Sequence, residues 1–448
     1  MQTFEEKYNW FLSKSGVDYK EYQYKGIQWC VKRETEVDPE LPTLRGGIIA
    51  DEMGLGKTIM MIATFLIHYL PKTLIILPNV ILDQWRTEIF RTTGHKVLIY
   101  HGPNKKKITH EMLDSATIVL TTYHTIASNL KKPNNLLHDI HWDRVVFDEA
   151  HHLRNKTSIY IGAKMLRSNV RWLISGTPIQ NRLKDFSRLC SVLQIPASFY
   201  SEVDNLRYFL KNFVMKRSKK DVGIILPELT VHSEPVSWAN LDERKMSHRV
   251  HLAVTYAHSF EKLKWMLFAR QACILPRLIK RDAIHAAPES YQGFTKIHAV
   301  IHAVLSNKDN GNGKLIFCHF REEIDIIVSL LREAGIQKVC YFDGRVSQAQ
   351  RTRYLAQQFE VIVLQIQTGC EGLNLQKGYS EIYFVSPHWN PAVEDQAVAR
   401  CHRIGQINPV HVYKFYMDHF EEDRSLTLDQ YISHMQQDKR EISNKVFS

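Results

Sequence analysis

The sequence has little that would place the chain in a membrane or outside the cell. No apolar run approaches the roughly 18 residues that a membrane-spanning helix needs. The amino terminus, MQTFEEKYNWF, has no basic segment followed by an apolar core, so we expect no secretory signal and no membrane partner. Low-complexity tails and short fixed-period repeats are also lacking, which leaves an ordinary folded protein as the expectation.

Cysteine is scarce and scattered. The chain has seven cysteines in 448 residues and no CxxC pair, a pattern that excludes a disulfide framework, a zinc ribbon and a RING finger. No HExxH motif or Cys/His ligand spacing is present, so we expect no structural zinc. Unpaired cysteines suit a reducing compartment, and we therefore expect an intracellular protein.

The charge balance is basic. Lys and Arg number 58 against 47 Asp and Glu, which gives a formal net charge of +11. Such a balance is compatible with a polyanionic partner such as nucleic acid, although many basic proteins bind none.

Two sets of short, β-branched apolar runs predict the fold class. Runs of this kind are typical of strands buried on both faces, and the helical patterns between them indicate βαβ units with parallel sheets. Two sets predict two α/β lobes, while the region at about 180–300 between them reads as helical. The runs are GGIIADE (46–52), TLIILP (73–78), ATIVLTTY (116–123), RVVFDEA (144–150) and RWLISGT (171–177), then KLIFCHF (314–320), KVCYFDG (338–344), VIVLQIQ (361–367), EIYFVSP (381–387) and VHVYKFY (410–416).

A glycine-rich segment, DEMGLGKT (51–58), predicts a phosphate-binding loop. It follows the first apolar strand and precedes an apolar helix, which is the context that such a loop requires. Gly54 and Gly56 allow backbone N–H groups to approach phosphate oxygens, Lys57 would reach the β- and γ-phosphates, and Thr58 would bind Mg²⁺. Asp51 stands where the general pattern usually has its first glycine.

A second acidic motif, DEAH (148–151), follows a strand as well. Asp148 is predicted to hold Mg²⁺ and Glu149 to orient or deprotonate the attacking water, because nucleotides bind beyond the carboxyl ends of parallel strands. The alternative for two carboxylates after a strand is a helix amino-terminal cap. SGTPIQN (175–181) is a weaker signal of a γ-phosphate relay, since Gly-Thr-Pro is also a common turn.

The second half carries its own candidates. QTGCEGLNL (367–375) offers Gly369 and Gly372 for a close backbone approach. Arg400 and Arg403 are three residues apart, a spacing that predicts one helical face. Two such arginines in isolation usually form a solvated face, but in this series they are candidates for arginine fingers.

In this order the motifs resemble those of the SNF2 family of superfamily 2 helicase-like ATPases, over about residues 18–416. The combination of DEMGLGKT, SGTPIQN and HRIGQ carries most of the specificity. The matching segments also include YKEYQYKGIQWC (19–30), LIILPNVILDQWRTEI (74–89), VLTTYHT (119–125), MKRSKKDVGIILPEL (215–229), RQACILP (270–276), YFDGRVSQAQR (341–351), SPHWNPAVEDQ (386–396) and ARCHRIGQ (399–406).

The resemblance implies two tandem RecA-like P-loop lobes with helical insertions and ATP in the cleft between them. We expect a first, ATP-binding lobe at 1–230 with a helical protrusion, a helical insertion at 231–305, a second lobe at 306–430 and a polar carboxyl-terminal helix at 431–448. Little sequence remains for an appended chromatin-binding domain, so we expect a minimal motor that a partner protein directs to its target.

The resemblance also implies ATP hydrolysis with Mg²⁺ and movement along double-stranded DNA or nucleosomes. Lys57, Asp148, Glu149, Arg400 and Arg403 would be the catalytic residues, and Thr58 and Asp148 the metal ligands. The residues implied to contact ATP are Gln23, which would read the adenine, and the loop residues Asp51, Glu52, Met53, Gly54, Leu55, Gly56, Lys57 and Thr58.

The DNA contacts follow from the resemblance alone. It places the loops after three strands on the DNA-facing side, although core packing is an equal alternative for Trp85 and Trp389. Two basic runs, 105–107 and 216–220, could meet phosphates, with a solvated loop as the alternative for the first. The candidate contacts are Asn79, Gln84, Trp85, Thr122, Trp389 and Asn390.

Two other functions remain open at this point. DEAH also occurs in helicases that separate RNA or DNA strands, and a nucleic-acid-binding scaffold with weak ATPase activity is possible in principle. Intact Lys57, Asp148 and Glu149 argue against the scaffold, and the RIGQ and GLNL strings favour duplex DNA. The location would be the nucleus in a eukaryote, or the host nucleus or a cytoplasmic replication site for a virus.

Overall fold

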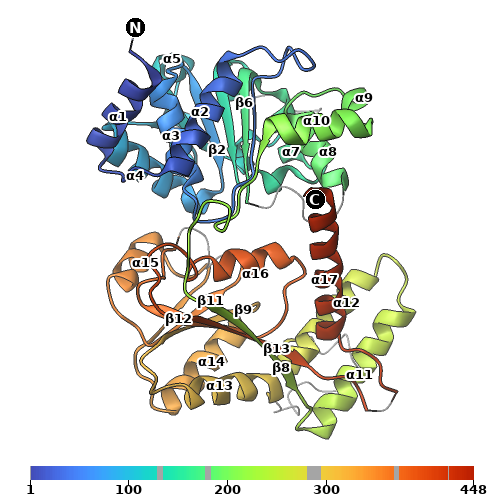
Figure 1. Cartoon of the computed structure of the whole chain (residues 1–448). Coiled ribbons are helices and arrows are strands. Elements are labelled where there is room, and N and C mark those ends of the chain that lie inside the picture. The colour runs from blue at the N-terminus through green and yellow to red at the C-terminus, as the bar shows by residue number, and fades with distance from the viewer. Residues whose placement is uncertain are drawn as a thin grey trace. The chain divides into compact units, whose positions relative to one another are not determined.

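The computed structural model describes residues 2–128, 135–176, 183–279, 294–367, 373–421 and 423–447. The chain divides into two compact units, residues 1–225 and 226–448. Each unit is built on one parallel sheet with helices on both faces (Figure 1). Among the helices described, none combines the length and the apolar composition needed to cross a bilayer.

The first unit contains a seven-stranded parallel sheet in the order β3-β4-β2-β5-β6-β1-β7. All five strands expected in this half of the sequence are confirmed. Two further strands, of three and two residues, are too short to give an apolar pattern. The strands are β1 (Gly46–Ile49), β2 (Thr73–Leu77), β3 (Leu98–Tyr100), β4 (Ile118–Thr122), β5 (His141–Asp148), β6 (Arg167–Ile174) and β7 (Val214–Met215).

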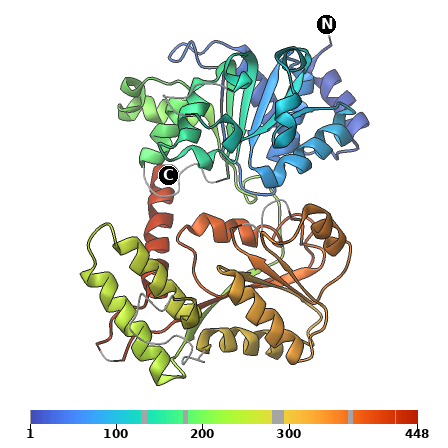
Figure 2. The same ribbon diagram turned by 180° about the vertical axis from the view of Figure 1, so that it is seen from behind.

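Helices α1 to α4 pack on one face of this sheet, with α7, α8 and α10 on the other side (Figures 1 and 2). The α3 helix is apolar almost all round, because it lies between the sheet and its neighbours. The helices are α1 (Phe4–Ser15), α2 (Glu21–Thr35), α3 (Lys57–Ile67), α4 (Leu82–Thr93), α5 (His110–Ser115), α6 (Tyr123–Ile126), α7 (Ser158–Met165), α8 (Leu183–Val192), α9 (Ala197–Tyr200) and α10 (Val203–Phe213), with short 3-10 turns η1 (Asn79–Ile81), η2 (Pro103–Lys107), η3 (Leu136–His138) and η4 (Ala150–Leu153).

A buried ion pair joins α2 to the sheet beneath it. The Glu34 carboxylate accepts hydrogen bonds from Arg144 Nε and Trp172 Nε1, both at 2.7 Å, and both members of the pair are fully buried. Burial alone would raise the pKa of Glu34, but Arg144 and the hydrogen bonds from His68, Arg144 and Trp172 lower it below its usual value. The pair therefore fixes where α2 lies on the strands.

The second unit contains a six-stranded parallel sheet in the order β10-β11-β9-β12-β13-β8. The five strands expected here are confirmed, and the helical reading of 241–273 resolves into two helices. The elements are β8 (Leu229–Val236), α11 (Leu241–Tyr256), α12 (Lys262–Ile274), the 3-10 turn η5 (Pro276–Leu278), α13 (Thr295–Ser306), β9 (Gly313–Cys318), α14 (Arg321–Glu333), β10 (Val339–Phe342), α15 (Gln348–Leu355), β11 (Val361–Gln365), β12 (Tyr379–Phe384), α16 (Pro391–Val398), β13 (Val410–Met417) and α17 (Leu428–Phe447).

The edge strand β8 was not among the expected strands. It pairs with β13 in parallel over residues 229–236, so the domain boundary expected at residue 230 falls inside it. Its residues alternate between exposed and half-buried because successive side chains point to opposite faces of the sheet. Pro235 is tolerated because β8 is the last strand in the order of the described sheet. An alternating, polar strand gives no continuous apolar run, which is why the sequence pattern missed it.

The second sheet is covered on both faces. Side chains of α13 and α14 meet one set of strand residues, including Ile316 and Val363, and α16 and the following turn meet the alternate set, including Phe317 and Leu364. The carboxyl-terminal helix α17 begins three residues before the expected start and packs on α12 and the end of β13 (Figure 1).

Replacing Arg144 by Met is expected to lower the free energy of unfolding of the first unit by roughly 3–5 kcal/mol, because Glu34 would be left buried without its counter-ion. Urea unfolding followed by circular dichroism measures the loss. The matched control is Arg86→Met, whose exposed pair with Asp83 is 3.0 Å long and should contribute under about 1 kcal/mol. Equal losses in the two variants would contradict the role given to Arg144.

Candidate active site

The loop between β1 and α3 has the backbone of a phosphate-binding loop. Gly54 and Gly56 have φ angles of 91° and 81°, a region that side chains other than glycine rarely adopt. Lys57 is the first residue of α3, and its Nζ donates to the carbonyl oxygens of Asp51 at 2.7 Å and Glu52 at 3.3 Å. Burial lowers the pKa of Lys57, while the carboxylates of Glu149, Asp148, Asp51 and Glu52 act in the other direction.

The unusual residue of this loop, Asp51, has a specific partner. Arg217 binds the Asp51 carboxylate with two hydrogen bonds, of 3.1 Å from Nε and 2.5 Å from Nη2, and its Nη1 donates to the carbonyl oxygen of Tyr22 at 2.5 Å. A bidentate pair of this kind fixes orientation as well as distance. Gly26 leaves room for it, because a Cβ there would lie 2.9 Å from Arg217 Nη2.

Lys219 adds a second tie to the same loop. Its Nζ lies 2.6 Å from Glu52 Oε1, and its backbone N–H donates to Glu52 Oε2 at 2.8 Å. The basic run at 216–220 was a candidate for contact with DNA phosphates, but two of its members have partners within the first unit. Arg217 forms an ion pair with Asp51, and Lys219 forms one with Glu52. These pairs join the basic run to the start of the phosphate loop.

Gln23 lies beside this loop, as the resemblance implies. Its Nε2 donates to the carbonyl oxygen of Leu55 at 3.1 Å, and the side chain is buried. A Cβ on Gly56 would lie 2.4 Å from the same nitrogen. Gly56 is therefore required both by its φ angle and by the close approach of Gln23.

The acidic pair lies at the carboxyl end of β5. Asp148 Oδ2 accepts a hydrogen bond from Trp85 Nε1 at 2.7 Å, and Oδ1 accepts one from the backbone of Glu149 at 2.9 Å. Burial and then the neighbouring Glu149 raise the pKa of Asp148 to about 7. Glu149 has a φ of 51°, and such strain in a residue with a long side chain is found mostly at functional sites.

Aromatic side chains contact the backbone and side chains of the acidic pair. The Tyr123 hydroxyl donates to the carbonyl oxygen of Asp148 at 2.6 Å, and its ring stacks on His152, which stacks on His151. His151 Nδ1 is 3.2 Å from Glu149 Oε2. Burial and the neighbouring His151 lower the pKa of His152 to about 4, so it is neutral at physiological pH. Tyr123 was not among the residues predicted from the sequence, where its position directly after an apolar run was the available signal.

The structure separates the DNA candidates of the first unit. Asn79, the first residue of η1, and Gln84 of α4 are exposed. Trp85 is 1% exposed, so the core-packing alternative is correct for it. Thr122 is also 1% exposed, and its hydroxyl lies 2.9 Å from that of Thr125, which leaves no surface for the expected contact.

Arg400 and Arg403 are not on a helical face, and that expectation is wrong. The α16 helix ends at Val398, and both arginines lie in the turns that follow it. Burial, and then the positive charge of Arg400, lower the pKa of Arg403. Arg403 donates to the side chain of Asn374, and Gly405 ends the turns with a φ of 95°.

Two motifs fall partly or wholly outside the described residues. Gly369 and Gly372 lie in that part of the chain, as does most of SGTPIQN. The described Gly176 of the latter motif lies next to the phosphate loop, because a Cβ there would be 3.5 Å from Lys57 Nζ.

Trp389 and Asn390 have internal roles in the second unit. The Trp389 ring is half-buried, with the Arg270 guanidinium 5.8 Å from its centroid and the Tyr431 ring 6.2 Å away. Asn390 caps α16, and its Oδ1 accepts from the backbone of Ala392 at 3.3 Å. These contacts give no support to the expected DNA contacts of either residue.

The residues of the first unit suit a nucleotide with a divalent cation. The loop presents backbone N–H groups at the start of α3, and Lys57 is held by carbonyl oxygens at the loop itself. Asp148 and Glu149 are adjacent carboxylates; burial and then the charge of Glu149 raise the pKa of Asp148, while Lys57 acts in the other direction. Two such oxygen donors are the ligands that Mg²⁺ prefers.

Comparison with known proteins gives matches over most of the chain. The SNF2-related domain matches residues 22–264, and the helicase conserved C-terminal domain matches residues 295–405. A probable global transactivator of the Orgyia pseudotsugata multicapsid polyhedrosis virus is 28% identical over 95% of this chain and 91% of its own length.

Two further matches are cellular. The ATP-dependent DNA helicase DDM1 of Arabidopsis thaliana is 28% identical over 89% of this chain, which spans 59% of that protein. The SWI2/SNF2 ATPase core of Sulfolobus solfataricus in complex with dsDNA is 23% identical, with a TM-score of 0.44 over 96% of each chain. With more than half of its residues matched by the SNF2-related domain, the chain belongs to the SNF2 family of helicase-like ATPases.

Proposed function

We propose that this SNF2-family ATPase hydrolyses ATP to ADP and phosphate in response to DNA, and that hydrolysis moves it along double-stranded DNA. The observation that carries the proposal is the cluster of Lys57, Asp148 and Glu149 in one unit. Each has the side chain that phosphoryl transfer requires, and the charges of Glu149 and Asp148 oppose the lowering of the Lys57 pKa that burial causes. Asp148 is buried and Lys57 and Glu149 are half-buried, and a protein that only bound nucleic acid would have no need of such a set of charges.

The phosphate loop would bind the triphosphate. Lys57 would exchange its two carbonyl partners for the β- and γ-phosphates, while backbone N–H groups of 54–58 bind the remaining oxygens. Gln23 would read the adenine from its place beside Gly56. Arg217 and Lys219 would not contact the nucleotide, but would hold the loop in its binding shape.

Asp148 and Glu149 would divide the work of hydrolysis. Thr58 and Asp148 would hold Mg²⁺, which, when bound, neutralises phosphate charge and orients the oxygens. Glu149 would accept a proton from the attacking water, since its carboxylate lies directly after the metal residue and is kept in place by a strained backbone. Trp85 and Tyr123 would fix the direction of Asp148.

Arg400 and Arg403 of the second unit would act as arginine fingers during turnover. Both arginines lie in the turns that follow α16, and their positive charges have the sign that a transition state with negative charge on its phosphoryl oxygens requires. Such residues contribute roughly 10³–10⁵-fold to the rate in other nucleotide hydrolases.

Duplex DNA is the proposed track. Exposed Asn79 and Gln84 follow a strand of the first sheet, and the lysines at 105–107 are exposed on the turn η2. The net charge of +11 favours a polyanion, and one relative is named a DNA helicase. Nucleosomes or other DNA-bound proteins would be the substrates that are moved, with a partner protein choosing the site.

An ATPase assay with matched nucleic acids tests the proposal. We expect duplex DNA to raise kcat at least about tenfold, with single strands and RNA less effective, and Lys57→Ala and Glu149→Gln to abolish turnover. Arg403→Ala should lower kcat far more than it changes the KM for ATP. Stronger stimulation by RNA, or separation of strands in a displacement assay, would favour the alternative helicase function.

Asp148→Asn is expected to abolish hydrolysis and to raise the melting temperature at pH 8 by about 2–4 °C, the change that roughly 1 kcal/mol produces in a domain of this size. A carboxylate whose pKa rises to about 7 on folding destabilises the fold once the pH exceeds its unfolded value, and fully so above pH 7. The asparagine removes that penalty and can still accept from Trp85. The gain should therefore shrink as the pH falls toward 4, and a gain independent of pH would contradict this explanation.

A further inference from the structure

The segment 386–390 joins β12 to α16 without regular secondary structure, yet its backbone is tightly held. Each carbonyl oxygen from Ser386 to Trp389 accepts a hydrogen bond from a side chain elsewhere in the second unit. Irregular segments usually leave such carbonyls to water. The donors are His319 Nε2 to Ser386 O at 3.2 Å, Arg270 Nη2 to Pro387 O at 2.6 Å, Gln436 Nε2 to His388 O, and Lys439 Nζ to Trp389 O at 2.6 Å.

Two of these four donors belong to the carboxyl-terminal helix α17. Gln436 also donates to Glu394 Oε1 at 2.6 Å, and Glu394 in turn accepts from the backbone of His388 at 2.7 Å. Gln436 and Glu394 are both buried. The helix therefore holds the segment and the first turn of α16 through the same side chain.

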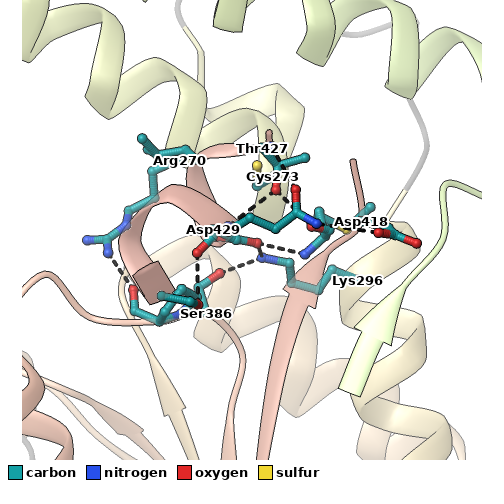
Figure 3. Close-up of polar contacts among 12 residues, drawn as sticks. Arg270, Cys273, Lys296, Ser386, Asp418, Thr427 and Asp429 are labelled. Carbon is teal, nitrogen blue, oxygen red and sulfur yellow. Dashed lines mark hydrogen bonds and ion pairs between the residues drawn. The ribbon is translucent and has the colours of Figure 1, made fainter. Parts of the chain in front are cut away.

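A buried ion pair anchors the start of α17 to the same segment (Figure 3). Lys296 of α13 pairs with Asp429, and both side chains are fully buried. Lys296 Nζ also donates to Ser386 Oγ at 2.6 Å, and Asp429 Oδ2 accepts from the backbone of Met417 at 2.9 Å. A buried pair must keep its partners, because either charge left alone would be strongly unfavourable. It therefore fixes α13, α17, the end of β13 and residue 386 against one another.

The held segment leads directly to the proposed arginine fingers. Asn390 caps α16, and α16 ends at Val398, two residues before Arg400. The position of α16 thus depends on the segment at its start, and the turns with Arg400 and Arg403 begin where it ends.

We propose that α17 is a positioning element for ATP hydrolysis, with Gln436 and Lys439 as its positioning residues. By holding the carbonyls of His388 and Trp389, they set the segment 386–390, the start of α16 and hence the turn that carries Arg400 and Arg403. The inference rests on the proposed function, because it concerns the residues assigned there as arginine fingers.

Lys439 gives the sharpest test, because it is only half-buried and its loss should leave the fold intact. In the full chain, Lys439→Ala should lower DNA-stimulated kcat about tenfold, with the KM for ATP within about twofold of wild type, since the loss concerns the transition state alone. Lys439→Arg keeps a donor and should recover most of the rate. Arg440→Ala is the matched control: it removes the same charge from the next position, where Arg440 forms an exposed pair of 2.7 Å with Asp395 of α16. An exposed pair contributes under about 1 kcal/mol, so its loss should disturb α16 far less than loss of the bond from Lys439 to the Trp389 carbonyl.

A second readout does not depend on activity. Hydrogen exchange at the amides of 386–390 should be faster in Lys439→Ala than in Lys439→Arg or Arg440→Ala, at similar melting temperatures. If the wild type is active and Lys439→Ala has the same kcat, this inference is overturned and the proposed function is unaffected. A rate loss equal to that of Arg440→Ala, or one that only follows the folded fraction, would also overturn it. A wild type without DNA-stimulated hydrolysis would overturn both proposals.

Discussion

The phosphate loop of the first unit depends on the ion pair between Asp51 and Arg217, which are 166 residues apart in the sequence. A loop that must present N–H groups to a triphosphate cannot use them to hold its own shape. In this chain the shape is supplied from outside, by Arg217 and Lys219, which bind the first two residues of the loop. Asp51 in place of a glycine is the acceptor that makes this support possible.

In each unit a buried ion pair fixes how the surrounding elements are arranged. Glu34 with Arg144, and Lys296 with Asp429, are ion pairs with no exposed side-chain surface. Such pairs contribute little net stability, because each charge loses its hydration, but they tolerate only one arrangement of the elements they join. The first pair places α2, which carries Gln23, and the second places α17 and the segment before α16. The parts of the molecule assigned to chemistry are therefore held by charge rather than by apolar packing alone.

The sequence was a good guide where strands are buried and a poor one where they are not. All ten apolar runs are strands, because a strand covered on both faces must be apolar throughout. The missed strands β3, β7 and β8 are short or lie at an edge, so few of their residues are buried.

The phosphate loop and the acidic pair could be predicted, since backbone chemistry restricts them to a few residue types. The partners of Asp51 and Asp148 could not, because Arg217 and Trp85 come from distant segments. The turn at Arg400 and Arg403 was missed because a spacing of three also occurs in consecutive turns.

The most direct test of the account is a double-mutant cycle on Asp51 and Arg217, measured as the affinity of the full chain for ATP. We expect Asp51→Asn and Arg217→Met each to weaken binding about tenfold, which is about 1.4 kcal/mol. The double variant should bind almost as well as either single variant, giving a coupling energy of roughly 1 kcal/mol or more. Losses that simply add would contradict the account, because the loop would then not depend on the pair.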